Sequence, residues 1–284
     1  MASVSHLLQL SDRLLSVSDT PRLDCELLLC HALEVDRTWL RTWPDKQVSA
    51  EQQQVFEVLL QKREQGNPVA YLVGSRGFWS MDLNVSSQTL IPRPETELLV
   101  EIALNLTLAG QCSVLDLGTG TGAIALALAS ERQDWQLTAV DCQPGAVALA
   151  QKNCRQQGLG NIEIFQSDWF SAIEAGSAYY DLIVSNPPYI SRHDPHLQQG
   201  DVRFEPSSAL VSGDEGLDDL KLIVSCSPTY LKAGGWLLVE HGYDQGGAVR
   251  NLFDSAGFVQ VTTHLDYNNL DRVTCGQWLN LSAQ

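Results

Sequence analysis

The sequence predicts an α/β protein in which helices cover both faces of a parallel sheet, preceded by a small helical domain. From residue 95 onward, short apolar runs alternate with stretches of helical length, which is typical of such sheets. A glycine-rich turn at 118–122 joins one apolar run to the alanine-rich stretch that follows it. The chain before residue 76 carries a mainly helical pattern instead.

The N-terminal domain, residues 1–75, is expected to contain three helices. Leucines recur among polar residues over 1–17, which predicts an amphipathic helix. Pro21 after Thr20 predicts the start of a second helix with Thr20 as its cap. Apolar residues recur over 50–64 and predict a third helix, which Gly66-Asn67-Pro68 would end.

Residues 76–94 are expected to form a hairpin-like linker. Aromatic and β-branched residues surround turn signals in two segments, 76–84 and 85–91.

Residues 95–284 form the predicted α/β domain. Strands are expected at 113–117, 136–141, 161–166, 180–185 and 236–240. Helices are expected between them at 95–109, 122–132, 144–157, 217–231 and 245–256. Two further strands are expected at 258–265 and 272–281.

The glycine-rich turn belongs to the motif Asp116-Leu117-Gly118-Thr119-Gly120-Thr121-Gly122. Glycine tolerates positive φ and lets the backbone approach a ligand. Asp141 ends the next strand, where a carboxylate can accept hydrogen bonds from ribose hydroxyls. The spacing G-x-G-x-G differs from the G-x-G-x-x-G of dinucleotide sites and suits a nucleoside with an amino-acid-like tail. We therefore expect S-adenosylmethionine here, with an ordinary tight turn as the alternative.

A second motif, Asn186-Pro187-Pro188-Tyr189, follows the predicted strand 180–185. Prolines fix φ and carry no N–H, so the carbonyls around them are held rigidly. The Asn186 side-chain oxygen and the Pro187 carbonyl can each accept one N–H of a planar –NH2 group, which turns the nitrogen lone pair toward an electrophilic carbon. Tyr189 can stack on that group. A Pro-Pro turn without this role is the alternative, but a sulfonium methyl is such a carbon, so the two motifs support each other.

Both motifs are expected at one edge of the sheet, because ligands bind outside the carboxyl ends of parallel strands. Asp168 and Trp169 also follow a predicted strand. Asp168 would accept from the adenine amine and Trp169 would lend an apolar face. A helix-capping Asp and a core Trp are the alternative.

The pairing of D-L-G-T-G-T-G with N-P-P-Y resembles the methyltransferases that modify a glutamine amide, and most closely the peptide chain release factor glutamine methyltransferase family. The resemblance covers nearly the whole chain. It includes segments 66–71, 78–79, 90–97, 166–170, 202–206 and 240–242. The family often has an acidic residue at the position of Gly77. Any role of that acidic side chain in the family is therefore in doubt for this chain.

The resemblance implies a Rossmann-like class I methyltransferase sheet whose last two strands pair antiparallel. It implies methyl transfer from S-adenosylmethionine to N5 of the glutamine in the Gly-Gly-Gln loop of class 1 release factors, leaving S-adenosylhomocysteine. The catalytic residues would be Asn186, Pro187, Pro188 and Tyr189, with Asn186 also touching the cofactor. The cofactor would be held by Gly118, Thr119, Gly120, Thr121, Gly122, Asp141, Asp168 and Trp169. The N-terminal domain would recognise the protein substrate, or would be a stabilising appendage.

The charge distribution bears on the substrate. The chain has a net charge of −16, and residues 86–284 hold 23 acidic against 10 basic groups. Such a domain repels a phosphate backbone, and no basic stripe with interleaved aromatics is present. This disfavours direct nucleic-acid binding and an adenine methyltransferase. A ribosomal-protein glutamine methyltransferase is the closer alternative, and a non-catalytic cofactor-binding module would be expected to have lost the second motif.

Cysteines and hydropathy indicate a cytoplasmic protein without a membrane partner. None of the seven cysteines forms a C-x-x-C pair, which indicates reduced thiols. No apolar run approaches the ~18 residues of a membrane span, and the first residues lack a signal-peptide pattern. His193 and His196 have no third ligand nearby, so no metal site is expected.

Overall fold

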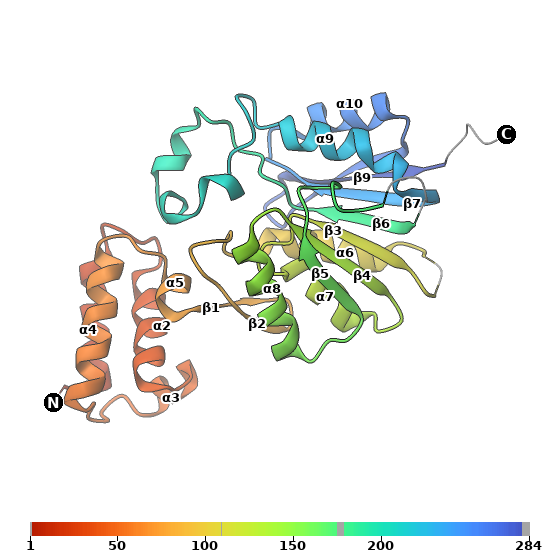
Figure 1. Ribbon diagram of the computed structural model, residues 1–284. Coiled ribbons are helices and arrows are strands. Elements are labelled where there is room, and N and C mark those ends of the chain that lie inside the picture. The colour runs from red at the N-terminus through yellow and green to blue at the C-terminus, as the bar shows by residue number, and fades with distance from the viewer. Residues whose placement is uncertain (1, 109, 175–178, 280–284) are drawn as a thin grey trace. The chain divides into compact units, whose positions relative to one another are not determined.

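A computed structural model describes residues 2–108, 110–174 and 179–279 (Figure 1). The chain forms two compact units. Unit 1 comprises Met1–Ser75 together with Pro195–Phe204, and unit 2 comprises Arg76–Asp194 together with Glu205–Gln284. A short segment that follows the Asn-Pro-Pro-Tyr motif therefore belongs to the N-terminal unit. No helix of the described residues is long and apolar enough to cross a membrane.

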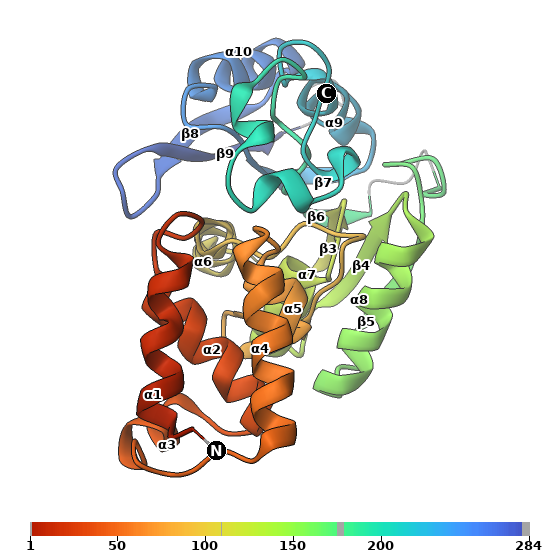
Figure 2. The same cartoon turned by 90° about the vertical axis from the view of Figure 1, so that its left-hand side faces the viewer.

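Unit 1 is helical, with α2 and α4 side by side (Figure 2). Its helices are α1 (Val4–Leu8), α2 (Pro21–Leu33), α3 (Arg37–Thr42), α4 (Ala50–Glu64) and α5 (Val69–Val73). Helix α4 begins at a capping box between Ser49 and Gln52, which satisfies backbone N–H groups of the first turn. The inserted segment adds two short 3₁₀-helices, η3 (Pro195–Gln198) and η4 (Val202–Phe204).

The prediction of a single α-helix over 1–17 is wrong, because the structure has a short α-helix followed by a 3₁₀-helix. Helix α1 continues as the 3₁₀-helix η1 (Gln9–Leu14). Leu8, Ser11 and Leu14 are buried, and their spacing of three residues matches the three residues per turn of a 3₁₀-helix. Residue 1 lies outside the described residues.

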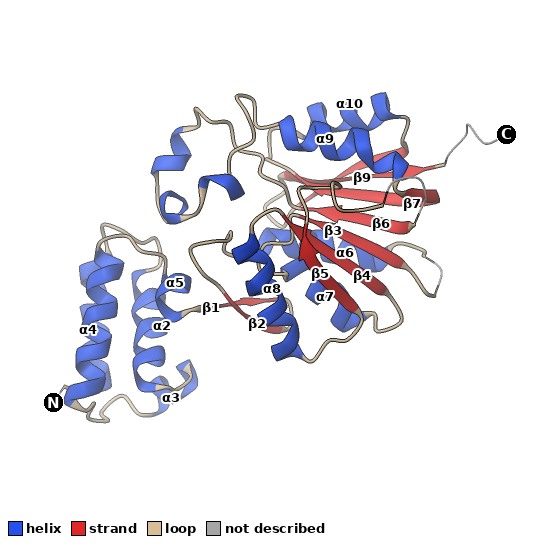
Figure 3. Ribbon diagram, viewed as in Figure 1, coloured by secondary structure: helices blue, strands red, loops and turns tan. Residues whose placement is uncertain are grey.

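Unit 2 contains a seven-stranded sheet in the order β5-β4-β3-β6-β7-β9-β8 (Figure 3). Its strands are β3 (Ser113–Leu117), β4 (Gln136–Asp141), β5 (Ile162–Gln166), β6 (Tyr180–Ser185), β7 (Leu231–Glu240), β8 (Val259–Leu265) and β9 (Asp271–Trp278). The first five strands in that spatial order pair in parallel, while β9 pairs antiparallel with both β7 and β8. The predicted α/β fold and the antiparallel pairing of its last two strands are confirmed.

Helices cover both faces of this sheet. Helices α6 (Glu97–Asn105), α7 (Ala123–Glu131) and α8 (Pro144–Gln157) contribute to one core, and α9 (Asp218–Cys226) and α10 (Gly246–Ala256) contribute to the other. Alternate residues of β3 divide between the two cores, with Val114 in the first and Leu115 in the second. This alternation follows from the period of two in a strand.

The predicted hairpin is present but shorter than the linker. Strands β1 (Ser75–Phe78) and β2 (Met81–Asn84) pair with each other. Residues 85–91 form no strand, because Thr89 N–H turns back to the Ser86 carbonyl at 3.2 Å. Phe78 and Met81 pack in the core of the parallel sheet, so the hairpin is part of unit 2.

Several predicted boundaries differ from the structure, among them the start of α6 at Glu97 and the end of β9 at Trp278. Helix α6 ends at Asn105, and residue 109 lies outside the described residues, as do 280–281 of the last predicted strand. Helix α9 ends at Cys226 because Pro228 supplies no N–H for a further turn. Strand β7 begins at Leu231, before Gly234-Gly235, since Gly234 adopts φ +86° and allows the register shift opposite Tyr180.

Candidate active site

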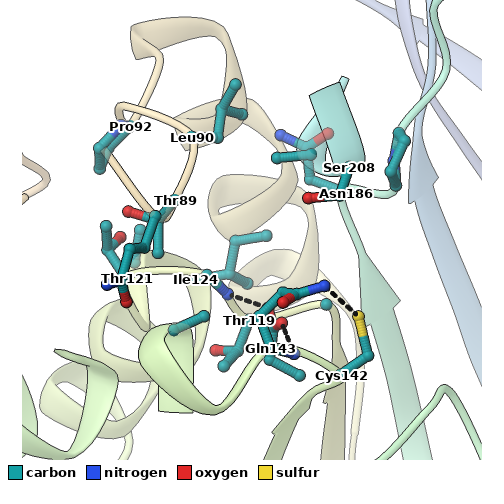
Figure 4. A pocket seen from close by; sticks show the side chains of 18 of the residues that line it. Thr89, Leu90, Pro92, Thr119, Thr121, Ile124, Cys142, Gln143, Asn186 and Ser208 are labelled. Carbon is teal, nitrogen blue, oxygen red and sulfur yellow. Dashed lines mark hydrogen bonds between the residues drawn. The ribbon is translucent and has the colours of Figure 1, made fainter. Parts of the chain in front are cut away.

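A pocket in unit 2 lies at the carboxyl ends of β3, β4, β5 and β6 (Figure 4). Parallel strands present their carboxyl ends at one edge of a sheet, which is where ligands bind in such folds. The pocket is lined by residues of the glycine turn, of the segments after β4, β5 and β6, of 88–96, and by Ser208 and Ala209. Figure 4 shows Asn186 and Ser208 together on one side of this pocket, apart from Thr121.

The glycine turn presents bare backbone to the pocket. Gly118 and Gly120 adopt φ of +71° and +57°, which L side chains rarely adopt. The N–H groups of Gly118 and Thr119 both donate to the Val140 carbonyl at 2.9 Å, so the turn is fixed to β4. A Cβ on Gly120 would meet nothing within 4 Å, which shows that the backbone here is open to a ligand.

Gly118 and Trp169 lie against each other. A Cβ on Gly118 would come within 3.3 Å of the Trp169 ring, and Trp169 itself adopts φ +46°. Both residues line the pocket. A side chain at 118 would therefore press against the indole that forms this wall.

Asp141 lies between the turn and the pocket. Its Oδ2 accepts from Gly120 N–H at 2.9 Å, and its Oδ1 accepts from Gln143 N–H at 2.9 Å. Each carboxylate oxygen has a further lone pair, so two ligand hydroxyls can still be accepted. Burial raises the pKa of this carboxyl, and the two backbone N–H groups oppose that rise.

Of the adjacent residues Asp168 and Trp169, only Trp169 lines the pocket. Trp169 lines the pocket together with buried Ser167. The Asp168 side chain is exposed and is not part of the lining, while its N–H donates to Ser171 Oγ at 3.1 Å. A role of Asp168 toward adenine therefore stays a prediction, and Ser167 is a polar wall residue that sequence reasoning missed.

The four residues after β6 also differ in position. Asn186 and Pro188 line the pocket, whereas Pro187 is buried beside it. The Tyr189 hydroxyl donates to Glu240 Oε1 at 3.1 Å. Burial raises the pKa of Tyr189, and the negative Glu240 raises it further. Stacking of Tyr189 on a substrate stays a prediction.

The Asn186 amide has a defined orientation. Its Nδ2 donates to Thr96 Oγ1 at 3.1 Å, so Oδ1 is the end of the amide that faces away from this hydrogen bond. No donor among the described residues binds that oxygen. A carbonyl oxygen on the wall of a pocket, held and unpaired, can accept an N–H from a ligand.

Asp116 and Thr119 form a buried pair beneath the turn. Thr119 Oγ1 donates to Asp116 Oδ2 at 2.6 Å, and Asp116 Oδ1 has no partner among the described residues. Burial raises the pKa of Asp116 to about 7, against the hydrogen bonds from Thr119 and the Ala125 N–H. Its position at the head of the glycine motif was the only signal for it in the sequence.

Segment 90–97 reaches the pocket through Glu205. The buried Glu205 carboxylate accepts from Ile91 N–H at 3.0 Å and forms an ion pair with Arg93. Arg93 and Thr96 both line the pocket. The sequence marked this segment only through the family resemblance, because its contacts depend on a residue more than a hundred positions away.

The pocket fits S-adenosylmethionine. Bare turn backbone suits a polar tail, the Asp141 carboxylate suits a ribose diol, and Trp169, Ile124 and Ala146 supply apolar surface for a base. The fold and this site define an S-adenosylmethionine-dependent methyltransferase.

Residues 92–205 match the family model described as methyltransferase small domain, and residues 6–74 match the PrmC N-terminal domain. A solved methyltransferase from Pyrococcus furiosus has the same fold, with a TM-score of 0.53 at 14% identity over 70% of this chain and 89% of that chain.

Two curated relatives define the family more closely. The release factor glutamine methyltransferase of Shewanella oneidensis is 52% identical over 95% of this chain and 93% of its own length. The release factor glutamine methyltransferase of Pseudomonas aeruginosa is 54% identical over 95% of this chain and 97% of its own length. The chain belongs to the release factor glutamine methyltransferase family.

Proposed function

We propose that this protein methylates N5 of the glutamine in the Gly-Gly-Gln loop of class 1 release factors. One observation carries the proposal: the Asn186 amide lies on the wall of the pocket that fits the methyl donor, and its Nδ2 donates to Thr96 Oγ1, which leaves the Asn186 carbonyl oxygen without a partner among the described residues. An amide –NH2 needs such an acceptor, because its nitrogen is a poor nucleophile while its lone pair is delocalised.

S-adenosylmethionine supplies an electrophilic methyl group. Asp141 would hold the ribose hydroxyls, and the backbone at Gly118 and Gly120 would lie against the polar tail. Trp169 would cover the base. These contacts would hold the methyl carbon near Asn186, and holding both reactants about 3–3.5 Å apart would supply much of the rate.

Asn186 Oδ1 and the Pro187 carbonyl would each accept one N–H of the substrate amide. The glutamine nitrogen then forms a bond to the methyl carbon as the carbon–sulfur bond breaks. Positive charge grows on the nitrogen, which strengthens both hydrogen bonds in the transition state. The extra proton leaves for water afterwards, since the charged nitrogen is acidic, and no strong base is required before attack.

The release factor as substrate is supported by the family and by charge. The curated relatives are named for release factors, and the acidic excess of residues 86–284 disfavours a nucleic-acid substrate. We place the reaction in the cytoplasm, where a release factor would meet the enzyme, with no membrane partner. A ribosomal-protein glutamine methyltransferase would share the Asn-Pro-Pro-Tyr motif, but no observation favours it.

A competition experiment tests the substrate class. The protein is given methyl-labelled S-adenosylmethionine with a release factor, a mixture of ribosomal proteins and duplex DNA in one reaction. The label should enter the release factor. Label on a ribosomal protein or on adenine, with the release factor unlabelled, would contradict the proposal.

A further inference from the structure

Two turns at the carboxyl edge of the sheet carry exposed aromatic and aliphatic side chains. The first turn follows β7 and contains Tyr243, which is 59% exposed. The second joins β8 to β9 and projects from the sheet (Figure 2), with Tyr267 77% exposed and Leu265 and Leu270 also exposed. Grouped apolar surface that faces water is typical of interaction sites. We call these four residues the rim.

The strand register places the rim level with the Asn-Pro-Pro-Tyr motif. Ser185 of β6 pairs with Val239 of β7, which pairs with Thr274 of β9. Thr274 pairs in turn with Thr263 of β8, so one row of residues crosses all four strands. Strand β8 runs in the same direction as β6, and it ends at Leu265, two residues beyond this row. The β8–β9 turn therefore lies on the same edge of the sheet as Asn186.

The rim is within reach of a protein that is bound at Asn186. Three strand spacings separate β6 from β8, because the spatial order is β6-β7-β9-β8. At about 4.8 Å each, these spacings amount to about 14 Å. A protein interface of standard size covers about 800 Å² on each partner, which corresponds to a disc with a radius of about 16 Å. A protein that delivers a glutamine to Asn186 would therefore extend over both turns.

Gln245 ties the first turn to the motif. Its Nε2 donates to the Tyr189 carbonyl at 3.0 Å, and its Oε1 accepts from Gly242 N–H at 2.8 Å. One amide thus joins the last residue of the Asn-Pro-Pro-Tyr motif to the residue before Tyr243. The backbone that carries the Tyr243 ring is fixed relative to the acceptor site.

The second turn is fixed by a buried carboxylate. Asp266 Oδ1 accepts from Leu270 N–H at 3.1 Å, and Asp266 N–H donates to the Leu270 carbonyl at 2.8 Å. Arg272 on β9 pairs with Asp266 Oδ2 at 3.1 Å. The Tyr267 hydroxyl donates to Glu101 Oε1 on α6 at 2.6 Å, so the end of this side chain is held while its ring is exposed. A surface that is ordered in this way loses little entropy when it binds a partner.

We propose that the rim is a docking surface for the release factor, beside the site that methylates it. The occupant is the domain that carries the Gly-Gly-Gln loop, because the loop would reach Asn186 only when that domain covers this edge. None of the four side chains is charged, which suits a protein surface and not a phosphate backbone. Tyrosine rings bury a large apolar area and keep a polar end, and they are enriched at protein interfaces. The inference rests on the proposed function, since it takes the release factor as the substrate.

Steady-state methylation of a full-length release factor, with saturating cofactor, tests the docking surface. Tyr243→Ala and Tyr267→Ala should each raise KM for the release factor about tenfold, the scale of one important interface residue. The kcat at saturating release factor should keep its wild-type value, because the rim would hold the substrate equally before and during transfer. Tyr267→Phe retains the ring and should retain most of the affinity.

Tyr179→Ala is the matched control at the opposite edge of the sheet. Tyr179 is 41% exposed and directly precedes β6. Its removal should change neither KM nor kcat. Calorimetry should give wild-type affinity for S-adenosylmethionine in all variants, which shows that each variant is folded.

Site-specific cross-linking supplies a readout that a purely structural role would not move. Benzoylphenylalanine in place of Tyr267 should cross-link to the release factor on illumination, whereas the same group in place of Tyr179 should not. A wild-type KM in both Tyr243→Ala and Tyr267→Ala, or equal cross-linking from positions 179 and 267, would overturn the inference and leave the proposed function intact. If the wild-type protein left the release factor unmethylated, the proposed function would fail, and the inference with it.

Discussion

Arg63 Nη1 lies 2.9 Å from Asp201 Oδ1, although 138 positions separate the two residues. Arg63 is on α4, and Asp201 is in the segment that follows the Asn-Pro-Pro-Tyr motif. The same guanidinium donates from Nε to Asp24 Oδ2 at 2.7 Å. This ion-pair cluster makes Pro195–Phe204 part of the helical unit.

Removal of Arg63 should destabilise unit 1 strongly. Its side chain is 5% exposed and Asp24 is also buried, so Arg63→Ala leaves a buried carboxylate unpaired, at a cost of about 3–5 kcal/mol. Asp201 is 38% exposed, and Asp201→Asn should cost about 1 kcal/mol or less. Urea unfolding measures both. Arg13→Ala, which breaks the more exposed pair with Glu64, is the control; equal losses for Arg13 and Arg63 would show that the buried pair is not special.

Asp141→Ala should weaken S-adenosylmethionine binding by about 1–3 kcal/mol, the cost of leaving buried polar groups unpaired. Both the ribose contacts and the acceptor for Gly120 N–H are lost. Isothermal calorimetry measures the affinity. Asp168→Ala is the matched carboxylate removal at an exposed position outside the pocket lining, and should cost less. If Asp168→Ala weakened cofactor binding as much as Asp141→Ala, this result would support a contact between Asp168 and adenine.

Asp116 should make the ligand-free protein less stable as the pH rises. Its pKa is about 7 when folded, against an ordinary 3.8. The protonated form is therefore favoured by folding, and the stability it gives is present at acid pH and lost as the pH rises toward 7. Asp116→Asn does not titrate. Its free energy of unfolding relative to wild type should improve by about 2 kcal/mol between pH 5 and pH 7 and change little above that. A constant offset in urea unfolding from pH 5 to 8 would contradict the assigned pKa.

The helical unit should matter for the protein substrate and not for the cofactor. A chain that starts at Arg76, with 195–204 replaced by a short flexible linker, keeps the β1–β2 residues whose Phe78 and Met81 belong to the sheet core. It should bind S-adenosylmethionine with wild-type affinity but methylate a full-length release factor poorly. Equal kcat/KM for the shortened and intact proteins would reduce the helical unit to an appendage.

Much of the fold follows from local pattern. The bounds predicted for β3, β4, β6, α4 and α8 agree with the structure, because each has a clear period and a turn or cap at its ends. The winding of 9–14 and the early start of β7 depended on tertiary packing and on a bulge opposite Tyr180. Local propensity contains no information on either.

The site was predictable where its residues follow strands directly. Asp141, Trp169 and Asn186 all line the pocket, as strand-end positions indicate. Thr96, Glu205 and Glu240 were not assigned roles, because each acts through a partner far away in sequence.

The membership of 195–204 in unit 1 could not be predicted for the same reason. There the Arg203 guanidinium lies where a Cβ on Gly66 would be, and Gly66 has φ +93°, so only glycine suits this position.

The account depends most directly on the acceptor atom and on Asn186. A release factor is incubated with S-adenosylmethionine and either the wild-type protein or Asn186→Ala, and its peptides are mapped by mass spectrometry over time. The wild type should add one methyl group to the glutamine of the Gly-Gly-Gln loop, and replacement of that glutamine should abolish transfer. Asn186→Ala should slow the transfer about a hundredfold or more while the fold survives. Methylation at any other residue, or an undiminished rate in Asn186→Ala, would contradict the account.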